Sequence, residues 1–151
     1  REMLADSGVA LAIVRTPKGC SASGATFFPA ADRALIVLSF RYLTDDHFWF
    51  TLFHEIGHLL LHSNDRIFLE GMQCSESEEK EANEFAERVL VPLEFREELL
   101  KFRRISDWRS IVRFSRKIGI SAGIVVGQLQ HKELIHYSYL NNLKNKYKWN
   151  E

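Results

Sequence analysis

The chain has few of the residues that cross-link or anchor a protein. It holds only two cysteines, Cys20 and Cys74, and three prolines among its 151 residues. Two thiols so far apart in sequence do not form the disulfide framework of small secreted domains, so we interpret both as reduced thiols of a cytosolic protein. No apolar run reaches the roughly 18 residues that indicate a membrane span. The N-terminus shows no basic segment followed by an apolar one, so no signal peptide is visible.

The formal net charge of the chain is zero, but its charged residues are unevenly distributed along the sequence. Residues 1–100 carry 9 basic and 17 acidic side chains, whereas residues 101–151 carry 11 and 3. This asymmetry is typical of a nucleic-acid-binding tail or of two halves that attract each other within one fold. The basic residues are scattered among apolar ones, which favours the second interpretation.

The length predicts a single domain, residues 1–151, with a real hydrophobic core. The first residue is Arg1 and not Met. We therefore expect this chain to be a fragment of a longer protein that lacks an upstream domain.

Three short apolar segments near the N-terminus predict strands. Residues 8–14, "GVALAIV", form a β-branched run bounded by glycine and "TPKG". Two more runs, "SASGATFF" and "ALIVLSF", flank the turn residues of "PAADR". The sequence therefore predicts a small sheet of about three strands.

Helical periodicity begins after these strands. A first helix should run from about residue 44 to His62, with Thr44 or Asp45 as its N-cap. A second helix should begin at a capping box formed by Ser75 and Glu78 and end before Pro92. The segment between them, "IFLEGMQ", has no clear period and fits either a loop or a short extended piece.

The C-terminal third predicts further short helices. Helical spacing recurs in residues 93–102 and 107–119, where Gly119 is the expected C-cap, and again in 121–132, where Ser121 is the expected N-cap. The tail "NNLKNKYKW" has spaced aromatic residues and should either pack back or fray.

The first helix contains the pattern His-Glu-x-x-His within "FWFTLFHEIGHLLLH". His54 and His58 are four residues apart, so their imidazoles lie on one helix face and could hold one Zn²⁺. Glu55 lies about 100° further round and could reach a water on the metal, as a general base does. His62, one turn beyond His58, fits a structural role at the helix end better than metal ligation.

A catalytic zinc site usually has three protein ligands and one open position. The second helix is the expected source of the third ligand, and we predict Glu79, with Glu81 as runner-up and Glu78 third. Asn83 follows Glu79 at i+4 and could bond a ligand imidazole from outside the metal's own shell, a role also open to His62. The arrangement resembles the glutamate zincins, with Asn in place of Asp.

Together the two motifs, "HEIGHLLLH" and "EKEANEFAERVLVP", resemble the ImmA/IrrE family of metallopeptidase domains over about residues 8–130. The resemblance implies a zincin-like α+β fold, with the small sheet packed on the two motif helices and short helices after them. It also implies zinc held by two histidines and a glutamate, and a catalytic Glu55. Family members are bacterial or phage cytosolic proteins, and many carry an upstream Xre-type or HigA-type helix-turn-helix domain that would make any DNA contact.

Two functions follow as hypotheses. The first is a zinc endopeptidase that acts on a repressor, antitoxin or toxin partner in toxin–antitoxin, phage or stress regulation. The second is a non-proteolytic zinc-binding sensor in an Xre-family transcription regulator or antitoxin. Direct nucleic-acid binding by residues 101–151 ranks below both, because "AGIVVGQLQ" offers few base-reading side chains. No membrane contact is expected, and the sequence does not define an oligomeric state.

An endopeptidase also needs a place for the peptide and a donor for the oxyanion. We expect an extended peptide to pair with a strand edge near residues 25–28 or 34–40. His131, His136, Tyr137 and Arg41 are the candidate oxyanion donors.

Overall fold

The structure is a computed structural model that describes residues 2–30, 32–62, 68–69 and 75–150. The chain folds as two compact units. The first comprises Arg1–Arg41 and Thr51–Ala86, and the second comprises Tyr42–Phe50 and Glu87–Glu151. No helix among the described residues is both long and apolar enough to cross a membrane.

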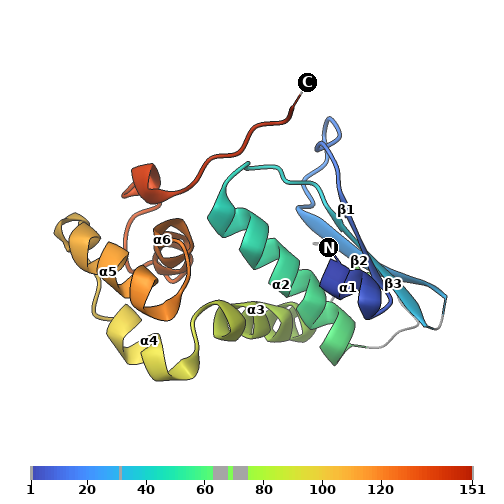
Figure 1. Cartoon of the computed structure of the whole chain (residues 1–151), viewed down its shortest axis with the longest axis horizontal. Helices are drawn as coiled ribbons and strands as arrows, with labels where there is room; N and C mark the ends of the chain where they lie inside the picture. The colour runs from blue at the N-terminus through green and yellow to red at the C-terminus, as the bar shows by residue number, and fades with distance from the viewer. Residues whose placement is uncertain (1, 31, 63–67, 70–74, 151) are drawn as a thin grey trace. The chain divides into compact units, whose positions relative to one another are not determined.

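The first unit contains the sheet. After the short helix α1 (Glu2–Asp6), strands β1 (Val9–Ile13), β2 (Gly24–Ala30) and β3 (Arg33–Leu38) lie side by side (Figure 1). The two-residue strand β4 (Phe68–Leu69) pairs with β2. The order is β1-β3-β2-β4, with β1 and β3 parallel and the other pairs antiparallel. The three predicted strands are confirmed, and β4 lies in the segment that the sequence left open between loop and extended structure.

The sheet order corrects one expectation. Strand β3 pairs with β1 on one side and β2 on the other, so residues 34–38 form the centre of the sheet. The prediction that an extended peptide adds to residues 34–40 was therefore wrong, because both edges of that strand are already bonded. The other edge predicted to bind a peptide, residues 25–28, is already paired in part, because β4 bonds to Ala25 and Thr26.

One face of the sheet is buried with a period of two. Thr26 on β2 lies opposite Ile36 on β3, and Gly24 lies opposite Leu38. These four residues are all buried, whereas their sequence neighbours on the strands are only partly covered. This alternation shows that the face carrying Gly24 and Thr26 is turned toward the core.

Two longer helices carry the sequence motifs, α2 (Asp45–Leu61) and α3 (Glu76–Leu90). The predicted capping box is confirmed, because the Ser75 backbone N–H donates to Glu78 Oε2 at 2.8 Å and the Glu78 backbone N–H donates to Ser75 Oγ at 3.2 Å. Within the first unit the two helices approach closely at Gly57, where an added Cβ would lie 3.1 Å from the Ala82 Cα. Small residues at this crossing bring the motif side chains together.

The second unit is helical. It contains α4 (Leu93–Leu99), α5 (Trp108–Ile118), α6 (Ala122–His131) and the 3₁₀ turns η1 (Ile105–Asp107) and η2 (Asn141–Leu143). Both predicted caps are confirmed: Gly119 has a φ of 78°, and Ser121 Oγ accepts from the Ile124 backbone N–H. The core of this unit is a cluster of ten buried apolar side chains: Val91, Leu99, Phe102, Ile111, Phe114, Val125, Val126, Leu129, Ile135 and Leu140.

The tail packs back onto the start of α2. Asp45, which is 1% exposed, accepts hydrogen bonds from the Ser121 hydroxyl and from the backbone and side-chain amides of Asn145. Thr44 and Lys146 form a β-bridge in the same region. Of the two cysteines, Cys20 is a free thiol and Cys74 lies outside the described residues.

Candidate metal centre and catalytic glutamate

The first unit brings two histidines of α2 and one glutamate of α3 together. The Nε2 atoms of His54 and His58 are 2.9 Å apart. Glu79 presents Oε2 at 3.4 Å from His54 Nε2 and Oε1 at 3.7 Å from His58 Nε2. Ligand atoms about 2.0–2.1 Å from a common tetrahedral centre would be separated by about 3.3 Å, and the three observed separations lie on either side of that value.

The chemistry of these donors also suits a metal ion. His54 and His58 are buried, and Glu79 is partly buried. Glu79 Oε1 is buried and has no hydrogen-bond partner among the described residues. A buried carboxylate oxygen without a hydrogen donor is costly unless a cation compensates it. His54, His58 and Glu79 therefore form a group that could hold one metal ion.

Neighbouring side chains fix the orientation of both imidazoles. His54 Nδ1 lies 3.0 Å from Asn83 Oδ1, which can only accept, so Nδ1 carries the proton and Nε2 keeps its lone pair for the metal. His58 Nδ1 lies 3.0 Å from His62 Nδ1, and His62 Nε2 lies 3.4 Å from Glu81 Oε2. If His58 Nδ1 and His62 Nε2 carry the protons, His58 donates to His62 and His62 donates to Glu81. The Nε2 lone pair of His58 then stays available for a metal ion, as that of His54 does.

The other glutamates of α3 have different partners. Glu78 Oε2 accepts from both the backbone and the hydroxyl of Ser75, so this side chain caps the helix. Glu81 reaches His62 rather than the pair of imidazoles. The ring of His62 contacts His58 and Glu81, a different set of partners from the free helix-end carbonyls expected from its position in the sequence.

The contact of Asn83 with His54 gives a first prediction. Replacing Asn83 with Ala removes the acceptor that orients His54, and loss of such an outer contact typically weakens metal binding about 10–100-fold. Competition with a chromophoric chelator would measure the Zn²⁺ affinity of Asn83→Ala. Asn142→Ala, the same change at an exposed position, is the matched control. Equal affinity of the two variants would contradict the orienting role.

Glu55 follows His54 on α2, and its side chain is held against the sheet. Its side chain is 1% exposed, and its Oε2 accepts a 2.7 Å hydrogen bond from the Thr26 hydroxyl. A Cβ at Gly24 would overlap Glu55 Oε1, so only glycine leaves room for this carboxylate. Thr26 and Gly24 thus position Glu55 from the buried face of β2.

Sequence reasoning did not assign these two positions a role. Both belong to "SGAT", which lies 29 residues or more before Glu55 and has no metal-ligand or acid–base spacing of its own. The signal that could have found them is that "SGAT" lies within the segment that resembles the ImmA/IrrE family.

The four candidate oxyanion donors belong to different units of the chain. Arg41, in the first unit, donates from Nη1 to the Ser21 carbonyl oxygen at 3.1 Å. In the second unit, His136 pairs with the Ser138 hydroxyl, Tyr137 is 75% exposed, and His131 lines a pocket on α6. The structure therefore does not single out one of these four residues as the donor.

Burial, the largest cause, acts together with the neighbouring His54 and His62 against the opposing effect of Glu78, and the net result lowers the pKa of His58 from its usual 6.5 to about 4. At neutral pH the imidazole is therefore neutral, which is the form that binds metal ions.

This shift gives a second prediction, for the metal-free protein. The unfolded chain binds a proton at His58 near pH 6.5, and the folded chain binds it only near pH 4. The free energy of unfolding is therefore unaffected by His58 above pH 6.5 and decreases as the pH falls from 6.5 toward 4. The full shift corresponds to roughly 3 kcal/mol. Urea unfolding of the chelator-treated chain at pH 7 and pH 5 should show a steeper loss for the wild type than for His58→Gln. Parallel losses would contradict the shift.

The α+β fold and the cluster of two histidines and a glutamate are consistent with a zincin-like domain. The sequence profile of the Peptidase_M78 family, described as the IrrE N-terminal-like domain, matches residues 11–130. The chain therefore belongs to this family, as the two motifs indicated. A search of curated proteins gave no significant match.

Proposed function

We propose that this domain is a zinc-dependent endopeptidase. The observations that support the proposal are the convergence of His54, His58 and Glu79 and the burial of Glu55, the residue next to His54 on the same helix. Two imidazole nitrogens and one carboxylate are the ligand set of several zinc peptidases, which keep a fourth position open. A bound zinc ion would polarise the peptide carbonyl and make a water molecule more acidic.

Glu55 supplies the proton transfers in this mechanism. Its carboxylate accepts a proton from the attacking water and returns it to the nitrogen of the leaving amine. The Thr26 hydroxyl bonds only one carboxylate oxygen, Oε2, and orients the group without neutralising it. The tight fit against Gly24 fixes the other oxygen.

The substrate we propose is a cytosolic protein such as a repressor, an antitoxin or a toxin partner. This step is supported by membership of the IrrE N-terminal-like family and by the resemblance to ImmA/IrrE domains. We propose that the domain acts in phage, stress or toxin–antitoxin regulation in the cytoplasm. Contact with DNA would then belong to an upstream domain.

A peptide-library digest analysed by mass spectrometry tests the activity over many cleavage sequences at once, so no single substrate has to be chosen. The zinc-loaded chain should produce cleavage sites that disappear with a chelator and return when zinc is added back. Binding of zinc with no cleavage of the library or of an operon partner would contradict the endopeptidase and support the zinc-binding sensor.

A further inference from the structure

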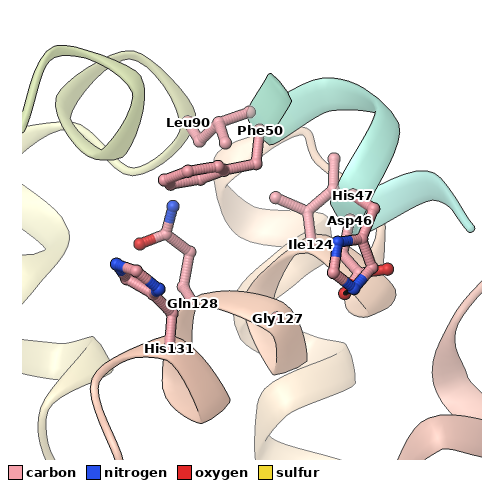
Figure 2. A pocket seen from close by; sticks show the side chains of 8 residues that line it. All are labelled: Asp46, His47, Phe50, Leu90, Ile124, Gly127, Gln128 and His131. Atoms are coloured by element: carbon pink, nitrogen blue, oxygen red, sulfur yellow. Dashed lines mark ion pairs between the residues drawn. The ribbon is translucent and has the colours of Figure 1, made fainter. Parts of the chain in front are cut away.

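The second unit contains a pocket of about 80 Å³ between the first turns of α2, the end of α3 and one side of α6 (Figure 2). Its lining combines apolar side chains with two histidines, one carboxylate and one primary amide. The residues are Asp46, His47, Phe50, Leu90, Ile124, Gly127, Gln128 and His131.

The amide of Gln128 is the unusual member of this lining. The residue is 4% exposed, and neither Nε2 nor Oε1 has a hydrogen-bond partner among the described residues. Figure 2 shows the amide extending from α6 toward Phe50. A buried amide that loses its hydrogen bonds to water without replacing them destabilises the fold. Its presence here therefore indicates that something other than packing retains it.

Gln130, two residues along the same helix, shows how this fold satisfies a structural amide. Its Nε2 donates to the carbonyl oxygens of Tyr137 and Tyr139, and its Oε1 accepts from Lys144. Gln128, which lines the pocket, has no such partners among the described residues.

A second polar atom of the pocket is also unpaired. Asp46 is 6% exposed, and its Oδ2 forms a 2.7 Å ion pair with Lys144 Nζ. Its Oδ1 is buried and has no hydrogen-bond partner in the described part of the chain. The pocket thus offers one donor and two acceptors, together with the rings of Phe50 and His131, whose centroids are 5.3 Å apart.

We propose that this pocket binds a small planar ligand with an amide edge, meaning an N–H donor beside a C=O acceptor as in a carboxamide or a lactam. Such an edge pairs with the Gln128 amide through two hydrogen bonds. Asp46 Oδ1 offers a second acceptor in the lining, and a carboxylate in place of the amide edge would lack the N–H that Gln128 Oε1 accepts. Phe50, Leu90 and Ile124 contact the ring of the ligand. None of its lining residues is a candidate metal ligand or Glu55, so ligand binding here would be a property of the second unit in addition to the proposed peptide hydrolysis.

Nicotinamide is a suitable probe, and nicotinate is its matched control because it replaces only the amide with a carboxylate. Titration of the full chain, followed by ¹H–¹⁵N NMR, should give saturable shifts of pocket residues with nicotinamide in the millimolar range expected for so small a ligand. Nicotinate should bind at least tenfold more weakly, a margin of about 1.4 kcal/mol.

The same substitution at the two glutamines separates binding from folding. Gln128→Met keeps the length of the side chain and removes the unpaired amide, so the melting temperature should rise by about 2–4 °C per kcal/mol recovered while nicotinamide binding is lost. Gln130→Met removes satisfied hydrogen bonds, so the melting temperature should fall while binding persists.

Three results would overturn the proposal: no nicotinamide shifts at millimolar concentration, equal binding of nicotinate, or unchanged nicotinamide binding by Gln128→Met.

The amide edge of the ligand has two sources, a free small molecule or the glutamine side chain of a peptide. Acetylglutamine methylamide distinguishes them: tighter binding than nicotinamide supports the amide site with a peptide ligand, and weaker binding supports it with a free heterocycle or carboxamide.

Discussion

Glu55→Gln is expected to abolish peptide hydrolysis while leaving the metal centre intact. The substitution keeps the size of the side chain and its contact with the Thr26 hydroxyl, but it removes the group that accepts the proton of the attacking water. Removing a general base typically lowers the rate about 10²–10⁴-fold. Initial rates on the library peptide that the wild type cleaves best would measure the loss.

The control for this variant is Glu84→Gln, the same change on the exposed face of α3. It should retain wild-type activity, and both variants should retain one equivalent of zinc. Cleavage by Glu55→Gln at the wild-type rate would remove Glu55 from the mechanism. Loss of zinc by this variant would instead show that the carboxylate maintains the metal centre.

Glu79→Ala and Glu81→Ala should differ strongly in zinc affinity. Glu79 presents oxygens at 3.4 and 3.7 Å from the Nε2 atoms of His54 and His58, whereas Glu81 contacts His62, the residue that follows α2. We expect Glu79→Ala to weaken zinc binding by more than about 100-fold, which exceeds the usual effect of losing a residue that only bonds a metal ligand. Glu81→Ala should weaken it by about 10-fold or less. Competitive chelator titrations of both variants under the same conditions would measure the difference.

The reverse order of the two affinities would assign the third ligand to Glu81. Equal and small losses would indicate that neither glutamate ligates the metal. Because both variants remove one carboxylate from the same helix, general electrostatic effects should be similar, and the difference reports the contacts.

Local features of the fold were predictable from the sequence because their causes are local. Ser75 with Glu78, Gly119 and Ser121 each satisfy helix ends through residues no more than four positions away. His54 and His58 share a helix face by virtue of their spacing alone. The tertiary structure is not needed to derive any of these features.

Features that depend on packing between distant segments were not predictable. The central position of β3 follows from the order in which strands pair, and an apolar run does not encode that order. The hydrogen bond of Thr26 to Glu55 joins residues 29 positions apart. The unpaired amide of Gln128 is visible only once its surroundings are known, because a glutamine on a helix is usually solvated.

The zinc content of the purified chain tests the metal centre most directly. After removal of all metal and dialysis against a limited excess of zinc, elemental analysis should find one zinc per wild-type chain and none in His58→Ala, since His58 Nε2 is one of the three converging ligand atoms. His136→Ala, which removes a histidine of the second unit, should bind zinc as the wild type does. Stoichiometric zinc in His58→Ala, or no zinc in the wild type, would contradict the account.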